Sequence, residues 1–223
     1  MTSTSASPAS DTSATSATPA SALLAEILHS PDTDEIGIRI LDAALGEYLE
    51  HGLRRTSVDD IARRAGIGRA TIYRRFPNRD ELLQAVLVRE CRRFFADIAA
   101  AVANLPTLAE RLVEGFVVGL RTARQQPLLN RMLTMEPEAS LPFLTIHGSP
   151  ALAVVREFLV QQYLASPEAK AGTVRMNPEE VAEILVRLSI SLVLTPDSCL
   201  PLRTDEEVRA TAQRYLAPLV LAR

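Results

Sequence analysis

Apolar residues recur along most of the chain at the three- and four-residue spacing that marks one face of a helix. Residues 34–50 carry such a stripe, and Gly52 follows as a helix stop signal. The apolar positions of this stripe are Ile36, Ile40, Ala44, Leu45 and Tyr48. With a short lead-in helix at residues 21–29, this pattern predicts that the chain begins as consecutive helices.

Two shorter helical segments come next, joined by a turn that contains glycine. Ser57 precedes the first segment as an N-cap, and Asp60 stands where a capping box places its acidic residue. Apolar residues follow at helical spacing at positions Val58, Ile61, Ala62 and Ala65. Gly66 can adopt a positive φ and turn the chain sharply into a second segment at residues 69–75.

A further helix is predicted directly after this second segment. Pro77 ends the segment, Asn78 supplies an N-cap, and Glu81 completes a capping box. Two short helices with a three-residue turn between them are typical of a helix-turn-helix motif, whose second helix enters the major groove of DNA. Ile67, Ile72 and Phe76 would anchor that helix. The positions left for DNA are Arg69, Ala70, Thr71, Tyr73 and Arg75.

Charge supports the same interpretation. Residues 52–79 hold eight arginines against Asp59 and Asp60, a local net charge of +6, whereas the whole chain carries −3. The remaining residues therefore carry −9. A basic region on an acidic body indicates a polyanionic partner that binds at one place.

The stretch TSVDDIARRAGIGRATIYRRFPNRDELL resembles the DNA-binding domain of the tetracycline-repressor (TetR) family of bacterial regulators, over about residues 36–86. It departs from the family at Gly68, where a Ser or Thr cap is usual. The resemblance implies that Arg69 reaches bases, with Ala70 and Thr71 beside it. It implies phosphate contacts by Thr56, Ser57, Tyr73 and Arg79.

Several of these residues also have a structural interpretation, which the sequence leaves open. Arg63 and Arg64 fit solvated helix-face charges that pair with the aspartates four residues earlier. Arg54 and Arg55 either contact phosphate or only solubilise their loop. Tyr73, taken alone, fits the edge of a core as well as a DNA contact.

The larger half of the chain also predicts helices, so the expected fold class is all-α. The expected ranges are residues 79–104, 108–126, 128–135, 150–163 with Ser149 as its N-cap, 178–195 and 204–219, with a looser connection at 141–148. We expect a disordered tail at residues 1–20, the helix-turn-helix domain at 21–86 with its lead-in helix, and an effector-binding and dimerisation domain at 87–223. The resemblance implies a homodimer formed by the last two helices.

The resemblance also implies a cavity for a small-molecule effector between these helices. Its expected lining residues are Phe94, Phe95, Ile98, Phe116, Met132, Phe143 and Tyr163. Because the chain has few aromatic residues, we expect a largely aliphatic or modest-sized apolar effector. Glu114 is a polar residue among apolar neighbours, and it either binds the ligand or pairs with Arg111 or Arg121.

Composition bears on where the protein acts and on whether it binds a metal. Apolar residues make up 47% and charged residues 23%, which is ordinary for a globular protein, and no apolar run approaches the length of a membrane span. Cys91 and Cys199 are far apart in sequence, and we expect reduced thiols of a cytoplasmic protein, with a disulfide between them as the alternative. The three histidines are scattered, so neither a metal nor another cofactor is expected.

Three functional hypotheses follow. The leading one is a regulator, usually a repressor, that binds double-stranded operator DNA and responds to a small molecule. The alternative is a regulator of the same fold without an inducer, controlled by a protein partner or by modification. An all-helical enzyme has little support, because no catalytic triad, metal cluster or phosphate-binding loop is present in the sequence.

Overall fold

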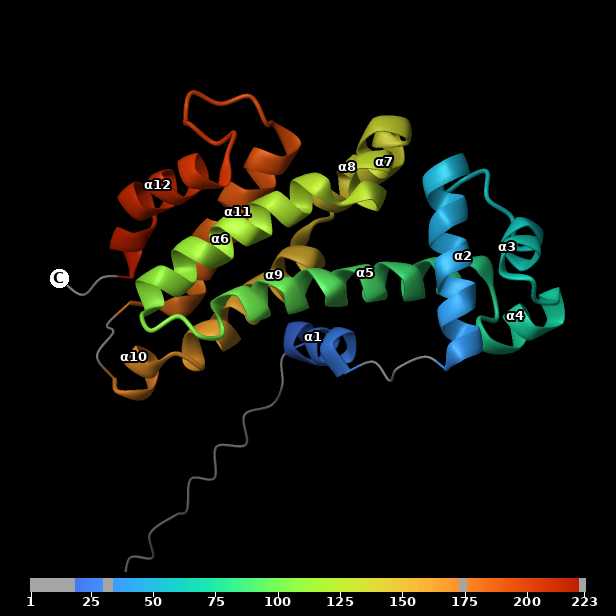
Figure 1. Cartoon of the computed structure of the whole chain (residues 1–223), viewed down its shortest axis with the longest axis horizontal. Coiled ribbons are helices and arrows are strands. Elements are labelled where there is room, and N and C mark those ends of the chain that lie inside the picture. The colour runs from blue at the N-terminus through green and yellow to red at the C-terminus, as the bar shows by residue number, and fades with distance from the viewer. Residues whose placement is uncertain (1–18, 30–33, 173–175, 221–223) are drawn as a thin grey trace, which may run out of the picture.

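The computed structural model describes residues 19–29, 34–172 and 176–220. Every regular element in these ranges is helical, which confirms the all-α prediction (Figure 1). The helices are α1 Pro19–His29, α2 Glu35–His51, α3 Val58–Ala65, α4 Arg69–Arg75, α5 Arg79–Val102, α6 Leu108–Gln125, α7 Pro127–Met135, α8 Pro137–Leu144, α9 Ser149–Leu164, α10 Pro167–Lys170, α11 Pro178–Leu194, α12 Asp205–Tyr215 and the 3₁₀ helix η1 Ala217–Leu219. Among the described residues, no helix has the length and apolar character to cross a membrane.

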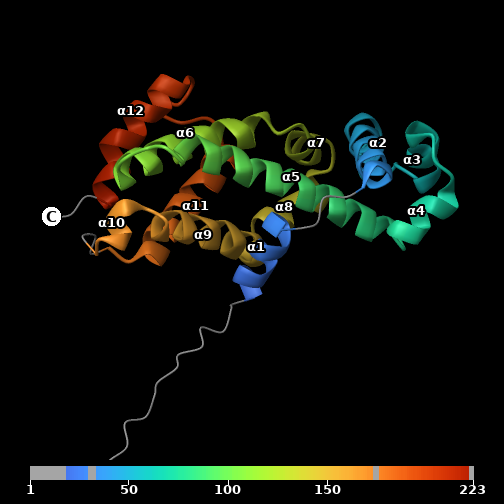
Figure 2. The ribbon, with the colours of Figure 1, turned by 60° about the horizontal axis from the view of Figure 1, so that its bottom comes forward.

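Helices α2, α3 and α4 form one end of the molecule, and α5 runs from them into the larger half (Figures 1 and 2). Their shared core contains Ile40, Tyr48, Ile61 and Ile72, each at most 1% exposed. Ile67 and Phe76 pack against this core, as predicted. The expected stripe of α2 is wrong at one position, since Ile36 lies in the first turn and is exposed.

The larger half contains two further apolar clusters. One joins α6 to the C-terminal segment and includes Val117, Leu120, Leu192 and Ala212. The other joins α1, α5, α6 and α9, and Phe95 stacks on Phe158 within it at a centroid distance of 4.6 Å. The cavity described below lies between these clusters.

Helix α1 differs from the expected domain assignment. Leu24 and Ile27 are buried in the cluster with Phe95 and Phe158, so α1 packs on α5 and α9 rather than on the helix-turn-helix end. It begins at Pro19, inside the segment expected as a tail, whereas residues 1–18 lie outside the described ranges. The boundary between residues 86 and 87 stays a prediction.

Other differences concern helix ends. The connection expected at residues 141–148 is helical up to Leu144 and contains Pro142 within the helix. Helix α9 begins at Ser149 itself, after Gly148, instead of using Ser149 as its cap. The last helix ends at Tyr215, and Leu219 lies in η1. A proline or an apolar run sets such limits only weakly, because tertiary packing decides how far each helix continues.

Helix α7 crosses the expected boundary from the other side. Leu128 is 1% exposed and belongs to the core of α2–α5, and Met132 packs against that same core. Arg131 donates to the carbonyl oxygen of Glu50 at 3.0 Å. The helix-turn-helix end therefore depends on a residue that is distant in sequence for part of its core.

Replacing Leu128 by Ala should lower the free energy of unfolding by about 2–5 kcal/mol, because it leaves a cavity in that core. Chemical denaturation followed by circular dichroism, at one protein concentration, measures the effect. Leu164→Ala is the matched control, since Leu164 is 57% exposed. Equal stability of the two variants would contradict the shared core.

Candidate nucleic-acid interface and effector cavity

Local capping signals build the helix-turn-helix. The Ser57 hydroxyl accepts from the backbone N–H of Asp60 at 3.2 Å, and the Asp60 carboxylate accepts from the N–H of Ser57, which completes the predicted capping box. Gly66 ends α3 at a φ of 63°, and its N–H donates to carbonyls of the preceding turn. This left-handed conformation favours glycine and turns the chain toward α4.

Helix α4 presents one face to the core and the other outward. Ile72 is buried, whereas Arg69, Ala70, Tyr73 and Arg74 are exposed. Thr71 is half-buried at the edge of the outward face. Gly68 precedes the helix without a side-chain cap. The predicted base-reading residues are thus on the surface of one short helix.

Arg75, unlike these surface residues, is already bound to another side chain of the protein. Its two terminal nitrogens donate to the two carboxylate oxygens of Asp34 at 2.6 and 2.5 Å. Asp34 is also the N-cap of α2 and accepts from the N–H of Gly37 at 3.0 Å. The hydrogen bonds that Asp34 accepts lower the pKa of its carboxyl group, the one from Arg75 more than the one from the Gly37 N–H. Arg75 therefore joins the end of α4 to the start of α2, and we withdraw it from the expected DNA contacts.

Thr56 is also placed differently from the expectation. It is 3% exposed, and its hydroxyl lies 2.8 Å from the carbonyl oxygen of Gly52 and 3.2 Å from that of Glu47. In this position the hydroxyl closes the end of α2 and cannot reach a phosphate. Ser57, the other member of the expected hydroxyl pair, is exposed beside it.

Arg69 has two neighbours on the outward surface. Its Nε lies 2.9 Å from Oδ1 of Asp59, and its guanidinium carbon lies 5.7 Å from the centre of the Tyr73 ring. The side chains of Arg69 and Asp59 are both more than half exposed. Tyr73, followed by Asp59, raises the pKa of Arg69. The guanidinium is thus charged and held between two side chains.

Of four other arginines in the region, two form ion pairs with carboxylates and two do not, within the described ranges. Arg63 pairs with Asp60 within α3, but Arg64 pairs with Glu47 and Glu50 of α2, not with the aspartates expected as its partners. These pairs across helices could not be read from i, i+4 spacing. Arg74 is exposed and Arg79 is half-buried, and within the described ranges neither forms an ion pair with a carboxylate.

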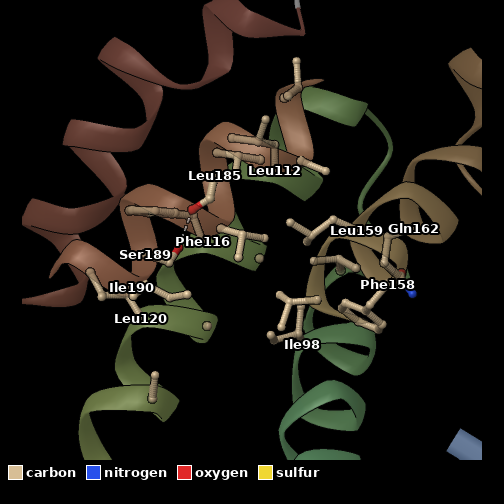
Figure 3. A pocket seen from close by; sticks show the side chains of 18 of the residues that line it. Ile98, Leu112, Phe116, Leu120, Phe158, Leu159, Gln162, Leu185, Ser189 and Ile190 are labelled. Carbon is tan, nitrogen blue, oxygen red and sulfur yellow. Dashed lines mark hydrogen bonds between the residues drawn. The ribbon is translucent and has the colours of Figure 1, made fainter. Parts of the chain in front are cut away.

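A cavity of about 240 Å³ lies among α5, α6, α9 and α11 (Figure 3). Residues of α6 and α11 line one side, and residues of α5 and α9 line the other. Four expected residues are in its wall, namely Phe94, Ile98, Phe116 and Tyr163. Leu129 of α7 also lines it, next in sequence to the buried Leu128.

Among the expected lining residues whose side chains the structure describes, two are not in this wall. Phe95 is 2% exposed and is not part of the wall, because it faces a different side of α5 from Phe94 and stacks on the wall residue Phe158. Met132 packs against the helix-turn-helix core instead. The side chain of Phe143 lies outside what the structure describes.

Most of the other residues that line the cavity were not predicted from the sequence. Phe158 and Leu159 of α9 and Leu185 and Ile190 of α11 face the cavity (Figure 3). Two glycines of α6 were a usable signal, since Gly115 and Gly119 are one turn apart on the face toward α5. A Cβ on Gly119 would lie 3.4 Å from the end of Ile98. These glycines leave room where a larger side chain would narrow the cavity.

Few polar groups border this cavity, and two of them are already hydrogen-bonded. The Ser189 hydroxyl donates to the carbonyl oxygen of Leu185 at 2.8 Å (Figure 3). Among the described residues that line the cavity, Arg111 is the charged one. It donates to the carbonyl oxygens of Leu105 and Ala103 at 2.9 and 3.2 Å. Gln162 of α9 supplies an amide.

Glu114 is not among the described residues that line the cavity. Its carboxylate accepts from Nε and Nη2 of Arg209 in α12, with a closest distance of 3.0 Å. The expected partners were wrong, since Arg111 binds backbone carbonyls and Arg121 pairs with Asp205. The structural interpretation of Glu114 as a paired carboxylate is correct, but its partner comes from the last helix.

Comparison with known proteins agrees with this architecture. The family described as "Bacterial regulatory proteins, tetR family" matches residues 40–86, and the family described as "Bacterial Tetracyclin repressor, C-terminal domain" matches residues 108–217. The HTH-type transcriptional regulator Rv1255c of Mycobacterium tuberculosis is 29% identical over 182 residues, which cover 82% of this chain and 84% of that protein. AlkX of the same species is 26% identical and covers 80% of this chain and 82% of its own length.

Solved structures show the same fold. The TetR family repressor AlkX from Dietzia sp. matches with a TM-score of 0.56 and 21% identity, over 82% of this chain and 93% of that one. GusR of Salmonella enterica matches with a TM-score of 0.60 and 19% identity, over 84% and 97% of the two chains. The helix-turn-helix, the helical second half and the two family matches lead to one conclusion: the chain belongs to the TetR family of DNA-binding transcriptional regulators, which are not enzymes.

Proposed function

We propose that this regulator is a repressor that binds a palindromic operator as a homodimer and is released by a small, largely apolar effector. The observation that carries the proposal is the position of α7. Leu128 is buried in the core of the helix-turn-helix end, and the next residue, Leu129, lines the effector cavity. A ligand that shifts the cavity wall therefore acts on a helix that also packs under the DNA-binding end.

The proposed DNA contacts divide by chemistry. Arg69, Ala70 and Thr71 lie at the start of α4, where side chains reach base edges in the major groove. Ser57, Tyr73 and Arg79 supply two hydroxyls and a guanidinium for phosphate oxygens. Arg79 begins α5, so the N-terminal dipole of that helix favours the same anion.

The homodimer is proposed to form through α11 and α12. Ile184 of α11 is 50% exposed and Tyr215 of α12 is 53% exposed, and both belong to apolar stripes. A second copy would remove these surfaces from water and place two α4 helices on one DNA duplex. Because a regulator of transcription acts on chromosomal DNA, we also propose a cytoplasmic location.

The effector is proposed to be uncharged as well as apolar. The wall is built mostly from aliphatic side chains, and the Arg111 guanidinium already donates to two backbone carbonyls. Moving a charge into such surroundings without a partner costs far more than moving a hydroxyl or an amide. The volume is at the small end for ligand cavities, which favours a slender molecule.

Replacement of DNA contacts should separate affinity from base preference. Arg79→Ala should weaken binding to all sequences about equally and reduce the slope of log affinity against log salt by about one. Thr71→Ala and Arg69→Ala should change the preference between operator variants by about 1–3 kcal/mol per lost base contact. If all three variants bound a selected operator like the wild type, α4 would not be the recognition helix.

Arg74 and Arg75 offer a matched pair of adjacent arginines. Arg75→Ala should lower the melting temperature by about 2–4 °C, because it removes the bidentate contact to Asp34. Arg74→Ala should leave melting unchanged, because its side chain is exposed and forms no ion pair within the described chain. The reverse ranking in a thermal melt would show that Arg75 is not the structural residue.

A series of ligands with one chain length and different head groups tests the effector proposal. 1-Decanol, decanoate and decylamine are titrated against the preformed protein–operator complex. The alcohol should lower operator affinity by about 5- to 150-fold, and the two ions should have much weaker effects. A stronger effect of decanoate that disappears in Arg111→Met would refute the uncharged effector. Tight binding of the alcohol without any change in operator affinity would instead favour the alternative of a regulator without an inducer.

A further inference from the structure

A carboxylate, that of Asp59, lies beside Arg69 on the proposed DNA-binding surface. Asp59 is more than half exposed and contacts Arg69, whereas the capping of α3 is performed by Ser57 and Asp60. The hydrogen bonds that cap the helix therefore do not involve the Asp59 side chain. Its charge suits the positive end of the helix dipole, but it also lies beside Arg69 on the surface proposed to meet phosphates, so it bears on DNA recognition.

The position of Asp59 relative to Arg69 suggests what the carboxylate does. Oδ1 of Asp59 lies 2.9 Å from Nε of Arg69, so the ion pair is formed on the Nε side of the guanidinium rather than at its outer end. The Tyr73 ring lies beside the same guanidinium. Guanine presents two acceptors, O6 and N7, in the major groove, and the terminal nitrogens of an arginine match them as a pair.

An arginine that is already oriented also loses less freedom on binding. A free arginine side chain has many rotamers, and ordering it opposes binding. Contacts with Asp59 and Tyr73 restrict those rotamers before DNA arrives, so more of the contact energy remains for the correct base. Binding to arbitrary DNA, which relies on phosphate contacts, gains nothing from this orientation and is weakened by the carboxylate.

We propose that Asp59 is a positioning residue that orients Arg69 toward a guanine and keeps binding to unrelated DNA weak. The inference rests on the proposed function, in which α4 reads operator bases. It assigns to Asp59 a role in the ratio of specific to nonspecific affinity, and it predicts one guanine in each half-site whose recognition depends on the Asp59–Arg69 pair.

Asp59→Asn in the full chain is the first test. Affinities are measured by fluorescence anisotropy for a selected operator, for operators with each guanine replaced, and for unrelated DNA at several salt concentrations. Affinity for unrelated DNA should rise about three- to tenfold. Discrimination at one guanine per half-site should fall about three- to tenfold, a part of the about 5- to 150-fold that a bidentate contact provides.

Two further variants separate charge from position. Asp59→Glu keeps the charge and moves the carboxylate, so unrelated DNA should stay weakly bound while guanine discrimination falls. Glu26→Gln is the control, because it removes one negative charge from an exposed position in α1, outside the proposed DNA-binding and dimer surfaces. It should change neither quantity. Melting temperatures confirm that each variant is folded.

The Arg69→Ala background decides whether Asp59 acts through Arg69. Adding Asp59→Asn there should leave the base preference unchanged. A change of base preference in that background would mean that Asp59 contacts a base itself, and unaltered specificity of Asp59→Asn in the wild-type background would also overturn the proposal. If Arg69→Ala alone left base preference intact, the failure would belong to the proposed recognition helix rather than to Asp59.

Discussion

Helix α5 has to bury apolar side chains in two separate clusters, and the rest of the architecture depends on this constraint. Leu82 and Val86 belong to the core of the helix-turn-helix end, whereas Phe95 and Ile98 belong to the cluster with α1 and α9. A helix of 24 residues is about 36 Å long, so it reaches both. Rotation of α5 cannot improve one cluster without disturbing the other.

A buried charge fixes α5 further, midway between the clusters. Arg89 is 7% exposed, donates to the Asp42 carboxylate at 2.8 Å and lies 3.2 Å from the carbonyl oxygen of Leu41. Separating this buried guanidinium from α2 would leave Glu90, 3.4 Å away on its own helix, as its carboxylate partner among the described residues and would remove the other contacts, which is unfavourable. The contact therefore holds α5 against α2 in one register. Together with α7, which reaches the same core through Leu128, it gives the DNA-binding end two connections to the cavity.

Local signals made much of this fold readable from the sequence. The capping pairs Ser57–Asp60 and Thr204–Glu207 lie three residues apart, so their hydrogen bonds follow from the chain alone. The turn at Gly66 and the limits of α4 were predictable for the same reason. Contacts between distant residues were not, such as Asp34 with Arg75 or Glu114 with Arg209.

The cavity shows the same limit. Phe94 and Phe95 are adjacent and equally apolar, yet the cavity wall contains only the first, because the two side chains point to different sides of α5. Helix α11 is apolar on several faces, so periodicity alone could not identify the face that borders the cavity. Thr56 was misassigned because a hydroxyl that closes a helix end and one that contacts phosphate look alike in sequence.

The central claim is that α4 of a two-fold assembly reads DNA. Sequencing of genomic fragments captured by the purified full-length protein tests it most directly. We expect enrichment of a palindromic site whose half-site centres lie one helical turn, about 10 base pairs, or a multiple apart. We also expect this enrichment to disappear with Arg69→Ala. Capture without sequence enrichment, or enrichment that survives this substitution unchanged, would contradict it.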